Sequence, residues 1–142
     1  MFAKNQALEN EHLKKYKELA LDLGISAKGL PILKQALTHP AYFEGAKPAD
    51  EGDNQRLEFL GDAVLDMLVG ALLYKFYPDA HEGELTKMRA AVVCESYLAK
   101  KSEALGINNA LLLGKGSEAG GDRSRPSVLA DAFEAVLGAI YV

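Results

Sequence analysis

Five acidic residues stand out because they occur in the two most apolar segments of the chain, with no lysine or arginine in either segment. Glu58, Asp62 and Asp66 lie at i, i+4 and i+8 within residues 57–73, and Asp131 and Glu134 lie at i and i+3 within residues 128–142. In helices these spacings place each set of acids along one face. Carboxylate oxygens without histidine or cysteine beside them are ligands that suit Mg²⁺ or Mn²⁺.

A solvated acidic face is the simpler interpretation of the same residues. On an exposed helix, like charges at i and i+4 cost only about 0.2–0.5 kcal/mol. If two buried helices brought their acids within about 5 Å, each pair would repel by roughly 3 kcal/mol at an effective dielectric constant of 20. Protons, basic side chains or metal ions would then have to compensate. The spacing alone leaves both interpretations open.

The elements that must position these acids are predicted to be helices throughout, because apolar residues recur at helical spacing and no segment alternates as a strand would. We expect a single all-α domain over residues 1–142, with helices at about 8–23, 30–37, 54–76, 84–94, 96–105 and 128–142. Ser127 is the expected N-cap of the last helix. The glycine-rich segment 111–126 is predicted to be a mobile loop.

Composition places the chain among soluble globular domains, with 142 residues, 49% apolar and 25% charged residues, and a net charge of −4. The single cysteine, Cys94, excludes an internal disulfide and is predicted to be a small buried apolar residue. The most apolar stretch carries three carboxylates, so we expect no membrane span, no signal peptide and a cytoplasmic protein. Because the last predicted helix runs to Val142 without a cap, we expect the natural protein to continue beyond it.

The segment Asn54–Leu65 (NQRLEFLGDAVL) closely resembles the signature of the ribonuclease III family, in the form of the bacterial endonuclease domain. Three further blocks occur in family order: ALTH at 36–39, EG at 82–83 followed by MRA at 88–90, and LADAFEA at 129–135. The resemblance implies a helical bundle that forms a symmetric homodimer. It also implies Mg²⁺-dependent hydrolysis of double-stranded RNA, with Mn²⁺ as a substitute, that leaves 5′-phosphate and 3′-hydroxyl ends. Expected substrates are ribosomal and other structured precursors.

The same resemblance assigns roles to individual side chains. The implied metal ligands are Glu58, Asp62, Asp131 and Glu134, with Asp62 and Glu134 as catalytic residues and Glu82 as an outer acid. Asp66 matches no family ligand and is expected to be a partly exposed helix charge. The position of Gln55 holds glutamate in many members, so weaker support for a second metal ion is expected.

Phe59 has two interpretations. On a buried helix it would be a core aromatic residue, whereas the resemblance implies that it inserts into the partner subunit as a dimer anchor. Contacts to RNA are expected from basic residues after the acidic rim and in the glycine-rich segment, namely Lys87, Arg89, Lys115, Arg123 and Arg125. Bacterial relatives usually append a double-stranded-RNA-binding domain, which residues 1–142 do not include.

Two rival functions remain open. A catalytically silent relative would act only as an RNA-binding or scaffolding module, and the intact set of acids disfavours it. An unrelated helical di-metal phosphohydrolase would act on small phosphates or nucleotides. The rival phosphohydrolase would be active without duplex RNA, whereas a ribonuclease III domain would not.

Overall fold

The chain is helical, as predicted. The computed structural model describes residues 2–45 and 48–142, and the side chains from residue 11 onward within these ranges. The α-helices are α1 (Phe2–Asp22), α2 (Leu30–Ala36), α3 (Gln55–Phe76), α4 (Glu82–Val92), α5 (Glu95–Ala104), α6 (Ile107–Ala110), α7 (Lys115–Ala119) and α8 (Pro126–Tyr141). Three 3₁₀ turns are η1 (Ala27–Gly29), η2 (Pro40–Phe43) and η3 (Asp122–Ser124). Within the described residues no strand forms, and one isolated bridge joins Thr38 to Leu112.

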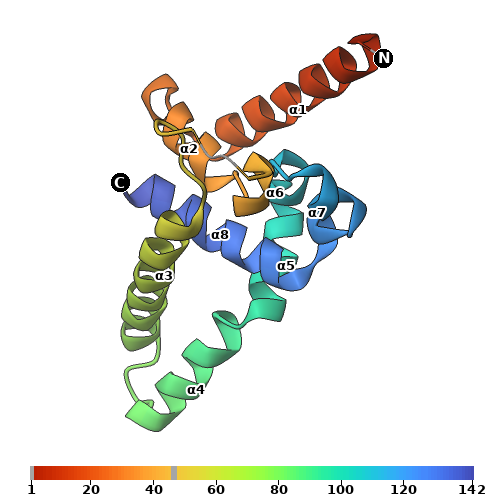
Figure 1. Cartoon of the computed structure of the whole chain (residues 1–142). Helices are drawn as coiled ribbons and strands as arrows, with labels where there is room; N and C mark the ends of the chain where they lie inside the picture. Colours follow the sequence, from red (N-terminus) through yellow and green to blue (C-terminus); the bar gives the residue numbers. More distant parts are fainter. Residues whose placement is uncertain (1, 46–47) are drawn as a thin grey trace.

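Helix α8 forms the centre of the molecule. Helices α2, α3 and α5 pack around it, and α3 crosses it near its own first turns (Figure 1). Leu129, Ala132, Ala135 and Val136 are buried along α8, where they meet the apolar side chains of α2 and α6. The four alanines and the single glycine of α8 let neighbouring helices approach closely, so one helix can be packed on several sides.

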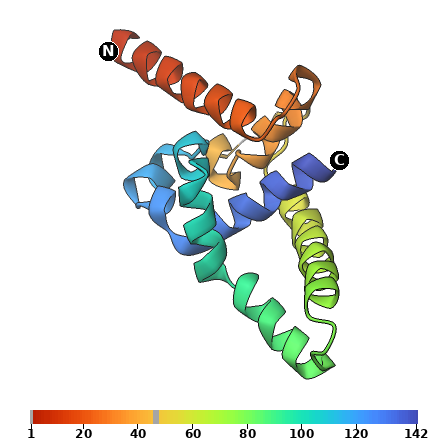
Figure 2. The ribbon, with the colours of Figure 1, turned by 180° about the vertical axis from the view of Figure 1, so that it is seen from behind.

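Helices α3 and α4 extend away from this centre as an open hairpin (Figure 2). Only one side of α3, with Leu57, Gly61, Val64 and Leu65, is buried against the rest of the chain. Its outer side exposes large apolar side chains, among them Phe59 with 81% and Tyr74 with 79% exposure. A helix with apolar residues on all sides is normally buried. Within one chain this holds for only one side of α3.

Residues 111–126 are not the mobile loop that their glycines suggest. The segment contains α7 and η3 and is joined to the body by side-chain hydrogen bonds. The main-chain N–H of Lys115 donates to Glu44 Oε1 over 2.8 Å, and the Arg123 guanidinium bonds to two main-chain carbonyls. The glycines suggested mobility, but Arg123 fixes the segment through the carbonyls of Asn108 and Leu111, which lie 15 and 12 residues earlier in the sequence.

Two further expectations were wrong. Helix α8 begins one residue before Ser127, at Pro126, and Arg125 occupies the N-cap. A proline is well suited to the first helical position because its ring presets φ and no N–H is needed there. Cys94 is exposed at the N-cap of α5 instead of buried, since the apolar run around it ends where α4 gives way to α5. Among the described helices, none is long and apolar enough to cross a membrane.

Candidate metal centre

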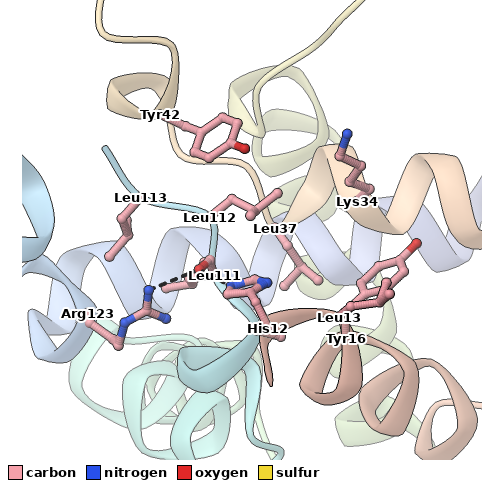
Figure 3. A pocket seen from close by; sticks show the side chains of 11 residues that line it. His12, Leu13, Tyr16, Lys34, Leu37, Tyr42, Leu111, Leu112, Leu113 and Arg123 are labelled. Carbon is pink, nitrogen blue, oxygen red and sulfur yellow. Dashed lines mark hydrogen bonds between the residues drawn. The ribbon is translucent and has the colours of Figure 1, made fainter. Parts of the chain in front are cut away.

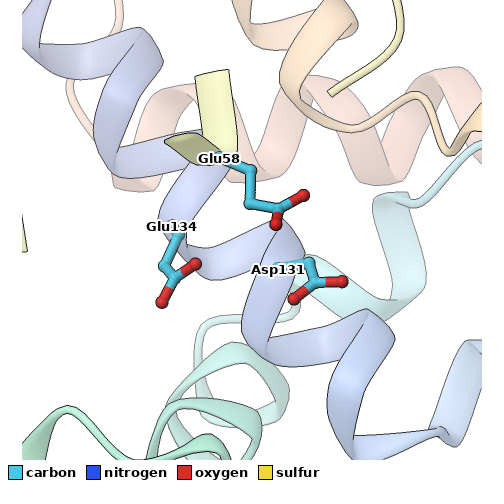
Figure 4. A group of neighbouring side chains, drawn as sticks. All are labelled: Glu58, Asp131 and Glu134. Atoms are coloured by element: carbon cyan, nitrogen blue, oxygen red, sulfur yellow. The ribbon is translucent and has the colours of Figure 1, made fainter. Parts of the chain in front are cut away.

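Three carboxylates from two helices meet where α3 crosses α8. Glu58, Asp131 and Glu134 each offer one oxygen, and these oxygens lie within 4.8 Å of one another (Figure 4). Glu58 lies in the first turn of α3, where its N–H donates to the carbonyl of the buried Asn54 over 2.8 Å. Asn54 in turn donates its N–H to the Thr38 carbonyl over 2.9 Å. This chain of main-chain bonds fixes the start of α3 against the end of α2.

The local sequence of α8 explains why its two acids face the same way. Asp131 and Glu134 are one helical turn apart, while the intervening Ala132 and the following Ala135 are fully buried. Residues three apart in a helix lie on the same face, so this spacing turns Asp131 and Glu134 in one direction. Both acids are half-buried where α8 meets α3, and Glu58 of α3 is half-buried as well.

The electrostatics of the cluster favour a proton or a cation. Burial, followed by the nearby charges of Asp62, Asp131 and Glu58, raises the pKa of Glu134 to about 7. Burial also raises the pKa of Glu58, with Asp131 and Asp62 as additional causes. In the described part of the chain no salt bridge joins a lysine or arginine to these three acids. The structure therefore shows a partly buried cluster in place of a solvated acidic face.

The donor set fits a small divalent cation. Oxygen ligands without nitrogen or sulfur suit Mg²⁺ or Mn²⁺. Opposite ligands of Mg²⁺ are separated by about 4.2 Å, twice a bond of 2.0–2.1 Å. The observed limit of 4.8 Å is only slightly larger. Changes of side-chain rotamer can therefore close the three oxygens around an ion without moving the helices.

The other predicted acids lie at different distances from this cluster. Asp62 follows Glu58 by one turn of α3 and is exposed, and its charge acts on both Glu58 and Glu134. Asp66 is partly exposed, as expected, and its Oδ1 lies 4.0 Å from Arg89 Nε of α4. Glu82 accepts a hydrogen bond from Thr86 within α4. It is the first residue of α4, and α4 begins at the outer end of the α3–α4 hairpin (Figures 1 and 2).

Gln55 and Phe59 are both exposed, unlike the three half-buried carboxylates. Gln55 is the exposed first residue of α3 and lines a hollow of about 550 Å³ together with Glu51 and Arg56. Phe59 follows Glu58 directly, and its 81% exposure excludes the core-aromatic interpretation within one chain.

The predicted RNA contacts differ in how far their side chains are already engaged. Lys87 and Lys115 are exposed, and Arg125 is exposed while it pairs with Asp122 over 2.8 Å. Arg89 pairs with Asp66. Arg123 is fully engaged, because it donates from Nε and one terminal nitrogen to Glu118 and from its terminal nitrogens to the Asn108 and Leu111 carbonyls. These bonds join η3 to α7 and to the end of α6, which is a structural role.

Two residues outside the predicted set of metal ligands act on the cluster. Burial is the main cause that raises the pKa of Asp131; the charge of Glu95, at the start of α5, raises it as well, and that of His39 lowers it. His39 caps η2, where its Nδ1 accepts from the Ala41 N–H over 3.2 Å. No local spacing could have revealed either neighbour, because both reach α8 only through the tertiary fold.

A separate hollow of about 380 Å³ lies between α1 and the segment after α6 (Figure 3). Five of its eleven lining residues are leucines. The His12 ring and the Arg123 guanidinium both donate to the Leu111 carbonyl at its edge, over 2.7 and 3.1 Å. These bonds join α1 and η3 to the body of the protein. The polar groups of this hollow therefore serve packing, and the chemistry of the chain is concentrated at the α3–α8 crossing.

Comparison with known proteins identifies the family. The sequence model described as Ribonuclease-III-like matches residues 31–142, which include the whole carboxylate cluster. The chain belongs to the ribonuclease-III-like family. It is 49% identical over 128 residues to Ribonuclease 3 of a Geobacillus species and 45% identical over 130 residues to Ribonuclease 3 of Listeria monocytogenes. These matches cover 90% and 92% of this chain but 52% and 57% of the relatives, so the chain spans about half their length.

Solved structures show the same family likeness. The nuclease domain of ribonuclease III from Campylobacter jejuni superimposes with a TM-score of 0.78 at 39% identity, covering 87% of this chain and 82% of that one. That structure is described as showing structural flexibility in a region involved in dimer formation. A second structure of the same nuclease domain gives the same TM-score at 38% identity. The helical fold predicted from the sequence is thus the fold of ribonuclease III nuclease domains.

Proposed function

We propose that residues 1–142 form the nuclease domain of a cytoplasmic endoribonuclease that hydrolyses phosphodiester bonds of double-stranded RNA. The products would carry 5′-phosphate and 3′-hydroxyl ends, and the substrates would be ribosomal and other structured precursors. The observation that supports this proposal most directly is the convergence of Glu58, Asp131 and Glu134 within 4.8 Å in a ribonuclease-III-like chain. A catalytically silent relative would have no need to keep three half-buried acids in mutual repulsion.

The residues proposed to hold Mg²⁺, or Mn²⁺ in its place, are Glu58, Asp62, Asp131 and Glu134. Such an ion supplies a Lewis acid for the phosphate and makes a bound water more acidic. The protein contributes three carboxylate oxygens within 4.8 Å of one another, positioned by the buried side chains of α3 and α8 at their crossing. Asp62 is exposed one turn after Glu58 on α3, so its carboxylate would be accessible to accept a hydrogen bond from the attacking water. With Glu134 it is proposed as a catalytic residue.

A homodimer is proposed because the outer side of α3 is apolar and uncovered in the single chain. Phe59, Ala63, Met67 and Tyr74 follow one another along this side, and all four are exposed. Helical spacing turns them in one direction, which gives a continuous apolar surface of the kind that marks an interface. Phe59 is the proposed anchor because it is the most exposed large apolar side chain on α3.

The basic residues proposed to contact RNA phosphates are Lys87, Arg89, Lys115 and Arg125. We omit Arg123 from this set because its guanidinium is already engaged by Glu118 and two carbonyls. Double-stranded RNA is recognised mostly through its shape and backbone, so flexible basic side chains suffice. With a net charge of −4 and few such contacts, binding by this domain should be weak and strongly dependent on salt.

The decisive experiment incubates the chain with long duplex RNA at low salt, with Mg²⁺ or with EDTA. We expect cleavage only with the metal, and a loss of at least about a hundredfold in rate for Asp62→Asn and for Glu134→Gln. Asp66→Asn is the matched control on the same helix and should keep most of the activity. Cleavage by Asp62→Asn or Glu134→Gln at the wild-type rate would refute the mechanism. Hydrolysis of small phosphate esters in place of duplex RNA would favour the di-metal phosphohydrolase.

A further inference from the structure

Two glycines lie at the point where α3 and α8 cross, and their arrangement is reciprocal. A Cβ on Gly61 of α3 would lie 1.7 Å from the main-chain oxygen of Glu134 in α8. A Cβ on Gly138 of α8 would lie 2.3 Å from the main-chain oxygen of Leu57 in α3. Each glycine therefore lies against a carbonyl of the other helix. That carbonyl belongs to the residue one turn before the other helix's own glycine. No other residue type permits this approach without moving the backbone.

The two carbonyls place this contact directly beside the carboxylate cluster. One belongs to Glu134 itself, and the other belongs to Leu57, the residue before Glu58. The distance between the helices at these glycines thus sets the distance between the acid of α3 and the acids of α8. An added Cβ at position 138 would meet main-chain atoms, which cannot rotate away, so α3 would have to move by about 1 Å to restore an ordinary contact of 3.4 Å or more.

We infer that Gly61 and Gly138 are positioning residues that hold α3 and α8 close enough for their carboxylates to surround a Mg²⁺ ion. This inference rests on the proposed metal centre and adds to it a determinant of ion size. Mg²⁺ requires ligands at 2.0–2.1 Å in nearly octahedral geometry, whereas Ca²⁺ accepts 2.3–2.6 Å and irregular geometry. Separating the helices should therefore weaken binding of Mg²⁺ more than binding of Ca²⁺.

The test is calorimetric titration of the chain with Mg²⁺ and with Ca²⁺, in the absence of RNA. For Gly138→Ala we expect the Mg²⁺ affinity to fall by at least about tenfold and the Ca²⁺ affinity to fall clearly less. Gly61→Ala should shift the same ratio further, because its Cβ would lie closer to the opposing carbonyl. Gly70→Ala is the matched control within α3. A Cβ there would have the Arg89 side chain as its nearest neighbour, at 4.0 Å, so both affinities should stay unchanged.

A second control separates positioning from a general loss of stability. Val136 is buried at 3% exposure in α8, so Val136→Ala should lower the melting temperature while it leaves the ratio of Mg²⁺ to Ca²⁺ affinity unchanged. If a glycine variant unfolds without metal, the concentrations of Mg²⁺ and Ca²⁺ that restore its helical signal give the same ratio through linkage. An unchanged ratio in Gly138→Ala, or an equal shift in Val136→Ala, would overturn the inference alone. A wild-type chain that binds neither cation would overturn the proposed metal centre and this inference together.

Discussion

Glu58 on α3 and Glu134 on α8 each direct a carboxylate oxygen to within 4.8 Å of the other, although they belong to helices far apart in the chain. Both are half-buried, burial is the first cause that raises the pKa of each, and the charge of Glu58 adds to the rise at Glu134. The protein thus holds together charges that would separate in the unfolded chain. A group held in this way makes the stability of the fold depend on pH and on bound cations.

The first prediction concerns the pH dependence of unfolding without metal. Folding raises the pKa of Glu134 from 4.5 to about 7, so the folded state binds the proton more tightly than the unfolded state. The contribution of this proton is therefore complete below about pH 4.5 and is lost as the pH rises toward 7. In EDTA, the midpoint of urea unfolding should fall between pH 5 and pH 7 by more in the wild type than in Glu134→Gln.

Added Mg²⁺ should reverse this loss, because the cation replaces the proton between the carboxylates. The midpoint at pH 7.5 should then rise with Mg²⁺ in the wild type and much less in Glu134→Gln. Identical pH profiles for the two proteins in EDTA would contradict the assignment of the raised pKa to Glu134.

The second prediction concerns Phe59 and the oligomeric state. Because this side chain is 81% exposed in the single chain, Phe59→Ala should change the stability of the monomer little. If it anchors the partner subunit, truncation should cost about 2–4 kcal/mol of association free energy and shift sedimentation toward monomer. Leu21→Ala, on the 79% exposed Leu21 of α1, is the matched control and should sediment as the wild type does. An undisturbed dimer in Phe59→Ala would refute the anchor role.

The third prediction separates the structural from the RNA-binding interpretation of Arg123. Lysine cannot reproduce the paired bonds to Glu118 together with those to the Asn108 and Leu111 carbonyls. Arg123→Lys should therefore lower the free energy of unfolding by about 1–3 kcal/mol. It should leave the salt dependence of RNA affinity unchanged.

Lys115→Gln is the comparison for Arg123→Lys, because Lys115 is exposed in the same segment. We expect it to leave stability unchanged and to reduce the slope of log affinity against log salt by about one. Wild-type stability in Arg123→Lys combined with a reduced slope would show that Arg123 contacts RNA after all.

Much of the fold was predictable because its signals are local. Apolar spacing located the long helices α3 and α8, and the acids without basic neighbours marked the two faces that meet. The meeting itself did not follow from spacing, which left a solvated face equally open. The resemblance to ribonuclease III singled out Glu58, Asp131 and Glu134, and the crossing of α3 over α8 brings these three together.

The errors arose where distant contacts decide the structure. Glycines in residues 111–126 suggested mobility, but Arg123 fixes the segment through the carbonyls of Asn108 and Leu111, more than ten residues earlier in the chain. Likewise, Glu95 and His39 act on Asp131 from separate elements, so their proximity appears only in the folded chain.

The central place of α8 has a consequence for how this protein can vary. One helix supplies the alanines of the core, the glycine of the crossing and two of the clustered acids, so its residues cannot be optimised for one task alone. A larger side chain at Gly138 would push α3 away, and a larger one at the buried Ala132 or Ala135 would crowd the core. Adaptation to new substrates should therefore accumulate in α4, α7 and the connecting turns, while α8 stays nearly fixed among active descendants.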